Sequence, residues 1–133
     1  MKNLVVSAIS FALVLFAVTG ASAQDKVQTL RTERDGTEVV NTSEIGKSFD
    51  GFAGAVPVEI YLKDGKITQI VPLDNEETPD FFKKACTLLS KWTGKSVKEA
   101  LGTRVDAVSG ATFSSEALIL NVKSGLEYYL KKK

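Results

Sequence analysis

The most constraining feature of this sequence is the alternation of apolar and other side chains over residues 56–62. A two-residue period is typical of a strand with one buried face. Residues 63–66 follow as Lys-Asp-Gly-Lys, and the central Asp-Gly pair suits the positive dihedral angles of a tight hairpin turn. Residues 67–73 are then the expected antiparallel partner, and residues 37–41 are a weaker strand candidate upstream. The pattern predicts an antiparallel sheet.

After residue 73 the pattern becomes helical. Thr78 is expected to cap a helix that has Pro79 at its first position, and Gly94 is expected to end it. Cys86 lies within the apolar stripe of this helix, which favours a buried small hydrophobe over a reactive thiol. The residues of the stripe recur at three- and four-residue spacings: Phe81, Phe82, Ala85, Cys86, Leu88, Leu89 and Trp92.

Two further helices are expected. Ser96 and Glu99 have the spacing of a capping box, which predicts a short helix ending near Gly102. A last helix is predicted to begin around Ser114 or Ser115. One face of this helix is expected to carry Leu118, Val122, Leu126, Tyr129 and Leu130. Strands followed by helices predict an α+β fold, a small antiparallel sheet packed by helices.

The first residues have the features of a secretory signal peptide. Lys2 gives a positive start, residues 4–18 are predominantly apolar, and Ala21-Ser22-Ala23 supplies a small-residue cleavage site. The apolar run is shorter than the roughly 20 residues that a membrane helix needs. We therefore expect a signal peptide at residues 1–23 and a single domain at residues 24–133, exported to the periplasm or another extracytoplasmic space and not membrane-spanning once processed.

Composition excludes several kinds of chemistry. The chain has no histidine and a single cysteine, which rules out Ser-His-Asp and Cys-His catalysis, zinc-finger and iron–sulfur sites. No metal site and no catalytic side chain are expected, so redox activity would require an organic cofactor. Removal of residues 1–23 would take away one of the 17 basic residues and leave 16 basic and 16 acidic side chains. This balance gives no basis for nucleic-acid binding.

The C-terminal Lys131-Lys132-Lys133 has two interpretations. A short basic run suits an acidic partner or a lipid surface, and it also places favourable charge at the C-terminus of a helix. The helix-end role is the better supported of the two.

Residues 106–115 form a run of small and hydroxylated side chains that leads directly into the last helix. The segment has two interpretations from its residues alone. It is a loop with a helix cap, or it is an anion site, because a helix start offers unpaired amides while Gly110 and Ala111 let a ligand approach the backbone. The lysine and spacing of a P-loop are missing, and the segment is not a G-x-G-x-x-G motif.

Residues 106–114, D-A-V-S-G-A-T-F-S, resemble the flavinylation motif of the FMN-binding domain family. That family includes extracytoplasmic flavin subunits of sodium-pumping and ferredoxin-linked respiratory complexes. The resemblance implies that a flavin transferase joins FMN to Thr112 through a phosphoester and recognises Asp106. Residues 51–56 and 77–79 resemble the family's glycine-aromatic and E-T-P segments, so the resemblance extends from about residue 49 to residue 130. Phe113 departs from the threonine or valine that is frequent at its position.

The resemblance also assigns roles around the phosphate. The phosphate would lie over the amides of residues 113–115, with the hydroxyls of Ser109 and Ser114 as further donors. Asp106 would serve recognition or metal assistance during attachment, because two anions in contact would repel. Its alternative role is to cap its own loop.

The flavin ring requires an apolar wall. Phe52, Phe113 and the hairpin are the candidates, whereas Tyr128 and Tyr129 are expected in the core. Glu77 would contact the ring edge or only favour the dipole of the following helix, and both alternatives remain open. The expected cofactor-binding residues are Phe52, Glu77, Thr78, Asp106, Ser109, Gly110, Ala111, Thr112, Phe113 and Ser114.

Four functions compete on this basis. The leading one is an exported electron carrier with FMN on Thr112, which passes electrons between a membrane reductase and other extracytoplasmic acceptors. The alternatives are a small extracytoplasmic flavin reductase, a noncovalent FMN-binding or sensing module, and an interaction domain with a vestigial motif. An electron carrier is favoured over an enzyme because no separate substrate domain is evident.

Overall fold

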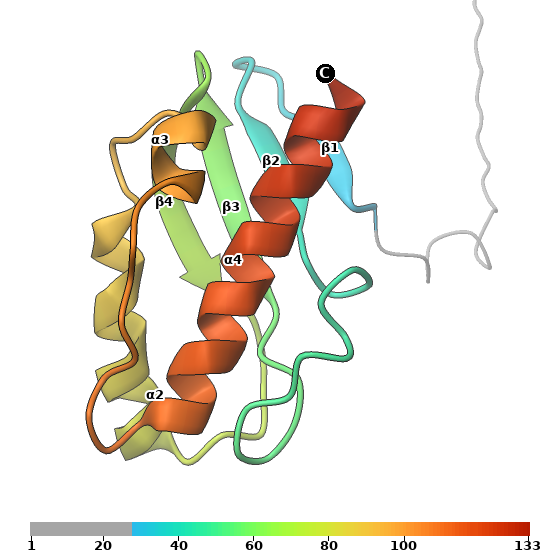
Figure 1. The fold of residues 1–133 in the computed structure, drawn as a ribbon. Coiled ribbons are helices and arrows are strands. Elements are labelled where there is room, and N and C mark those ends of the chain that lie inside the picture. The colour runs from blue at the N-terminus through green and yellow to red at the C-terminus, as the bar shows by residue number, and fades with distance from the viewer. Residues whose placement is uncertain (1–27) are drawn as a thin grey trace, which may run out of the picture.

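A four-stranded antiparallel sheet forms the base of the fold. The computed structural model describes residues 28–133, so the expected signal peptide at residues 1–23 lies outside the described range. The strands lie in chain order and are β1 (Leu30–Thr32), β2 (Glu38–Asn41), β3 (Val58–Lys63) and β4 (Lys66–Pro72). Figure 1 shows the long helix α4 (Thr112–Lys132) crossing one face of this sheet. The predicted α+β class is confirmed.

The hairpin between β3 and β4 has the predicted turn. Asp64 and Gly65 have φ angles of 53° and 77°, the positive values that a two-residue hairpin connection requires. Burial alternates along β3, where Val58, Ile60 and Leu62 are fully buried. Strand β2 lies within the predicted residues 37–41. Strand β1 was not expected from the sequence.

The helix predicted to run to Gly94 is two elements. Helix α2 (Pro79–Ala85) is followed by a 3₁₀ segment, η2 (Cys86–Lys91). The hydroxyls of Thr87 and Ser90 donate to the carbonyls three residues earlier, at 2.7 Å and 3.2 Å, which favours the tighter winding. Cys86 is half-buried, and burial raises the pKa of its thiol. This agrees with a packing residue and not with a reactive thiolate.

Helix α3 (Val97–Leu101) has the predicted capping box, with Ser96 accepting from the Glu99 amide and Glu99 accepting from the Ser96 amide. Helix α4 begins at Thr112, earlier than expected. Its N-cap residue is Ala111, whose side chain cannot form a capping hydrogen bond, so the sequence carries no signal for this start. The predicted apolar face of α4 is buried except for Leu130, which is 39% exposed.

Helix α4 lies very close to the sheet. A Cβ atom on Gly125 would approach Ile60 Cδ1 to 2.7 Å, so glycine permits this contact. The buried Asn121 accepts a hydrogen bond of 2.7 Å from the Thr42 hydroxyl, which itself accepts from the Val58 amide. These contacts fix α4 against β3 and the segment after β2. Among residues 28–133, no helix has the length and apolarity needed to span a membrane.

The C-terminal end of α4 is tied to β2. Tyr129 is buried and its hydroxyl donates to Glu38 at 2.5 Å, while Lys133 forms an ion pair with the same carboxylate at 2.5 Å. Burial and the Glu38 hydrogen bond raise the pKa of Tyr129 to about 12. Lys131 and Lys132 occupy the last turn of the helix, where cations are favoured. Tyr128 is only half-buried.

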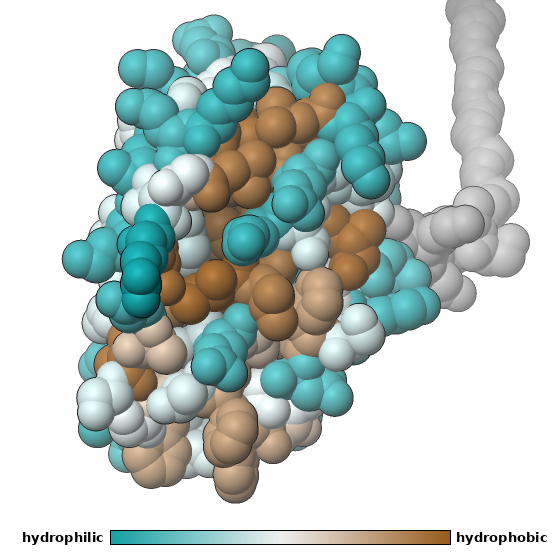
Figure 2. All heavy atoms as spheres, viewed as in Figure 1, coloured by the Kyte–Doolittle hydropathy of each residue, from teal (hydrophilic) through white to brown (hydrophobic). Residues whose placement is uncertain are grey.

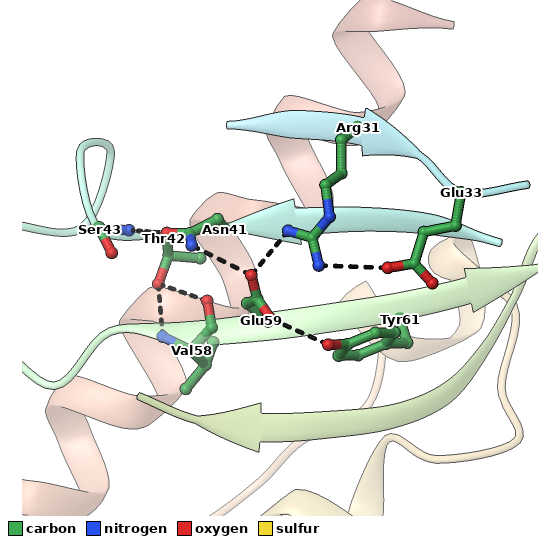
Figure 3. Close-up of polar contacts among 8 residues, drawn as sticks. All are labelled: Arg31, Glu33, Asn41, Thr42, Ser43, Val58, Glu59 and Tyr61. Atoms are coloured by element: carbon green, nitrogen blue, oxygen red, sulfur yellow. Dashed lines mark hydrogen bonds and ion pairs between the residues drawn. The ribbon is translucent and has the colours of Figure 1, made fainter. Parts of the chain in front are cut away.

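The opposite face of the sheet carries a polar network, which Figure 3 shows in close-up. Glu59 accepts hydrogen bonds from Arg31 at 2.7 Å, from Tyr61 at 2.9 Å and from Asn41 at 3.2 Å. The Arg31 hydrogen bond is the main reason that the pKa of Glu59 is lowered. Glu59 and Tyr61 alternate with the buried residues of β3 and therefore lie on the face away from α4, where Arg31 and Asn41 meet Glu59.

Candidate functional site

Three segments that are distant in sequence meet at the start of α4. They are the loop at residues 51–54, the residues that precede α2, and the segment at residues 106–115. Figure 1 shows these segments together at the end of the molecule where α4 begins. Figure 2 shows pale brown side chains at this same end, among white and teal ones. The three sequence stretches that carry the family resemblance therefore lie side by side.

The loop at residues 51–54 is a tight turn. The Gly51 amide donates to the Gly54 carbonyl at 2.8 Å, and Asp50 and Ala55 form an isolated bridge across its base. The loop presents Phe52 to solvent with 74% of the residue exposed. The backbone amides of Phe52 and Ala53 point the other way, toward Glu77.

The Glu77 carboxylate is buried behind this loop, with 6% of the residue exposed. It accepts hydrogen bonds from the Phe52 amide at 2.8 Å, from the Ala53 amide at 2.5 Å and from the Ser114 hydroxyl. Burial acts to raise the pKa of Glu77, but the Ser114, Ala53 and Phe52 hydrogen bonds outweigh burial, so the pKa lies below its usual value. Neither of the two expected roles for Glu77 accounts for these three bonds.

The first turn of α4 has free backbone donors. Gly110 has a φ of 87°, which turns the chain into the helix, and Ala111 at the cap offers no side-chain acceptor. The Ser115 amide already donates to the Ala111 carbonyl at 2.9 Å. Within the part of the chain that the structure describes, the unpaired amides are thus those of residues 112–114, one position earlier than the expected 113–115.

The four hydroxyls of this segment divide into two pairs. Ser114 and Ser115 are buried, the first donating to Glu77 and the second accepting from the Val108 amide at 3.0 Å. The Ser114 hydroxyl, expected to donate to a phosphate, is therefore already engaged. Ser109 and Thr112 are exposed, and neither hydroxyl has a hydrogen-bond partner among residues 28–133. Only the second pair is open to chemistry.

A pocket of about 240 Å³ lies at this junction. Its lining consists of Phe52, Phe81, Gly110, Ala111, Thr112, Phe113 and Ser114. The Phe52 and Phe113 rings have centroids 6.3 Å apart and planes inclined at 36°. Phe113 is 62% exposed and Phe81 is 49% exposed, so the walls are aromatic and open to solvent.

The structure brings six of the ten expected site residues into this lining and corrects the expected walls. The helical spacing predicts Phe81 in a core stripe, but the residue lies in the first turn of α2, is 49% exposed and lines the pocket. The β3–β4 hairpin was expected as a wall and contributes no residue to the lining. The helical spacing of apolar residues does not show which of them stay exposed, so the sequence gives no signal that separates Phe81 from a core residue.

The remaining four lie around the pocket. Glu77 lies behind it. Thr78 is the cap residue of α2, makes no side-chain cap bond, and lines a neighbouring surface depression. Asp106 and Ser109 are exposed on the loop before α4, and Asp106 pairs with Arg104 at 3.1 Å.

The pocket suits a ligand with a planar apolar ring and an anionic group. Exposed phenylalanine rings offer stacking surface, and the unpaired amides at the start of a 21-residue helix attract an anion. The backbone at Gly110 has open space beside it, since a Cβ there would meet no atom within 4 Å. The ring and phosphate of a flavin mononucleotide fit these donors and walls.

The fold and site define a small α+β module that binds such a ligand at a helix start. The FMN-binding domain family matches the chain over residues 51–127. The chain belongs to this family, and its predicted cofactor, FMN, is supported by the match. No curated protein and no solved structure gives a significant match.

Proposed function

We propose that this protein is an exported electron carrier that holds FMN through a phosphoester to Thr112. The single observation that carries the proposal is the state of the Thr112 hydroxyl. It is exposed, it has no hydrogen-bond partner among the described residues, it lies at the first position of α4, and it lines the pocket. Ser109 is also exposed but does not line the pocket.

Attachment forms one bond and breaks one. The Thr112 Oγ1 atom becomes bonded to phosphorus, and the bond from phosphorus to its leaving group in an activated flavin nucleotide breaks. The hydroxyl proton passes to a base of the transferase, and no electrons are exchanged. The unpaired amides of residues 112–114 would then face the phosphate oxygens.

Asp106 is proposed to serve recognition by the flavin transferase. Its side chain is 78% exposed, it precedes the acceptor by six residues, and its ion pair with Arg104 is on the surface. A surface pair of this kind contributes at most about 1 kcal/mol to stability. The carboxylate is therefore available to a second protein.

Electron transfer is supported by the openness of the pocket. FMN supplies the redox chemistry when bound, and the protein contributes its position and surroundings. The aromatic rings that line the pocket are exposed, so a partner protein can approach the same surface. A membrane reductase and extracytoplasmic acceptors are the proposed partners, in line with the secretory signal that the sequence predicts at residues 1–23.

The test is coexpression with an active flavin transferase, followed by denaturing gel electrophoresis and in-gel flavin fluorescence. We expect a fluorescent wild-type band, a dark Thr112→Val band and a fluorescent Ser109→Ala band. The Ser109 variant is the matched control, because it removes the other free hydroxyl of the same segment. A dark wild-type band beside a labelled control substrate would overturn covalent attachment.

A further inference from the structure

We infer that Glu77 is a positioning residue of the FMN site: its buried carboxylate ties the loop that carries Phe52 to the first turn of α4. This inference rests on the proposed function and adds to it how the ring walls are held. The tie would keep Phe52 and Phe113 in one relation to each other and to the Thr112 hydroxyl.

The two rings have little packing of their own. Phe52 is 74% exposed and Phe113 is 62% exposed, so neighbouring side chains leave most of each ring free. The placement of exposed rings depends on the backbone that carries them. The Glu77 carboxylate links the backbone of the loop to α4. It accepts from the Phe52 and Ala53 amides, 25 and 24 residues away, and from the Ser114 hydroxyl, 37 residues away.

The surroundings of Glu77 are built to hold it. Asn75 accepts from the Glu77 amide at 3.0 Å and donates to the Leu73 carbonyl at 3.0 Å, which fixes the turn before the carboxylate. Gly51 leaves the room that the carboxylate needs, since a Cβ there would lie 2.4 Å from Glu77 Oε1. Among residues 28–133, Glu77 has no ion-pair partner, so neutral donors alone stabilise its charge.

Two substitutions test the two sides of this link separately: the hydrogen bond from α4 to Glu77, and the hydrogen bonds from the loop to Glu77. Ser114→Ala removes the bond to α4 and leaves both amide bonds of the loop. Glu77→Gln keeps the shape but replaces one carboxylate oxygen with an amide group, which cannot accept from a backbone amide. Glu59→Gln is the matched control, because it neutralises a hydrogen-bonded carboxylate on the far face of the sheet, as Figure 3 shows.

The first measurement is amide hydrogen exchange in the flavin-free protein. We expect the Phe52 and Ala53 amides to exchange at least about tenfold faster in Glu77→Gln than in wild type, and by a larger factor than the Ile60 amide, which lies in the core and reports global unfolding. Glu59→Gln should leave the two loop amides at their wild-type rates. Equal rates at Phe52 and Ala53 in wild type and Glu77→Gln would overturn the inference.

The second measurement uses the FMN-loaded proteins. In Ser114→Ala and Glu77→Gln we expect a weaker visible circular dichroism of the flavin and a larger iodide quenching constant. Glu59→Gln should match wild type in both, although it too loses stability. Should Glu77→Gln not fold, Ser114→Ala carries the decision, since the carboxylate and its loop bonds remain.

The outcomes separate the two proposals. Wild-type protein that takes up no FMN would overturn the proposed function and the positioning role with it. Wild-type protein that carries FMN, together with unchanged dichroism and quenching in both tie variants, would overturn the positioning role alone.

Discussion

Replacing Gly51 with alanine probes the space around the Glu77 carboxylate most sharply. The new Cβ would lie 2.4 Å from Oε1, whereas ordinary contact begins at 3.4 Å, so the carboxylate must move by about 1 Å. Oε1 accepts from both the Phe52 amide and the Ser114 hydroxyl, so both bonds weaken together. Gly51 is not among the residues with positive φ, and alanine therefore adds no backbone strain.

The magnitude follows from these two bonds. A hydrogen bond to a charged group contributes about 1.5–3 kcal/mol, and partial relaxation of the carboxylate retains some of that. Loss of glycine from the unfolded chain returns about 0.4–1 kcal/mol. We expect Gly51→Ala to lower the free energy of unfolding by about 2–3 kcal/mol. In a domain of this size that corresponds to a fall in Tm of roughly 8–20 °C.

Urea unfolding followed by far-ultraviolet circular dichroism measures this change. Gly102→Ala is the matched control, because its Cβ would meet only the Lys98 and Glu99 carbonyls at 3.6 Å and 3.7 Å. The control should be unchanged or slightly stabilised. In Glu77→Ala the clash is gone, so Gly51→Ala added to that background should cost much less than in wild type. Equal midpoints for Gly51→Ala and Gly102→Ala would refute the reasoning.

Three further predictions concern the carboxylates and the thiol. Asp106→Ala should abolish FMN attachment with an unchanged melting temperature, and normal in-gel labelling would overturn its recognition role. Because the folded-state pKa of Glu77 is lowered, its stabilising contribution is present above its unfolded-state pKa of about 4.5 and is lost as the pH falls through the folded-state pKa. The free energy of unfolding of Glu77→Gln should therefore fall less steeply than that of wild type below about pH 4.5. Parallel stability curves for the two proteins would contradict this. Cys86→Ser should cost about 1 kcal/mol and leave the reduction of bound FMN intact, whereas loss of reduction with FMN still present would place the thiol in the chemistry.

Local signals in the sequence predicted several elements well. The Asp64-Gly65 turn and the Ser96–Glu99 capping box depend only on residues within a few positions of each other, and both occur as expected. Strand β1 gave no comparable signal, because its three residues are defined by pairing with β2 and not by their own pattern. The start of α4 was placed too late because its cap residue, Ala111, carries no capping side chain.

The site shows the same division. Residues 106–115 and Phe52 are assigned to the site by the resemblance of residues 106–114 and 51–56 to the FMN-binding domain family, whereas the small and hydroxylated residues alone also fit a plain loop with a helix cap. The hydrogen bonds of Glu77 join segments up to 37 residues apart, and no spacing in the sequence predicts them. Phe81 has the periodicity of a core residue, yet it is exposed and lines the pocket beside residues 110–114. Tertiary contacts, not local preference, determine these features.

The central claim is that FMN is bonded to Thr112. Intact mass spectrometry of protein purified from its native host, followed by fragmentation of the peptide that spans residues 106–115, tests it most directly. The account predicts a mass increase of FMN less water, localised to Thr112. A chain that carries no added flavin mass, or flavin localised to Ser109, would contradict it.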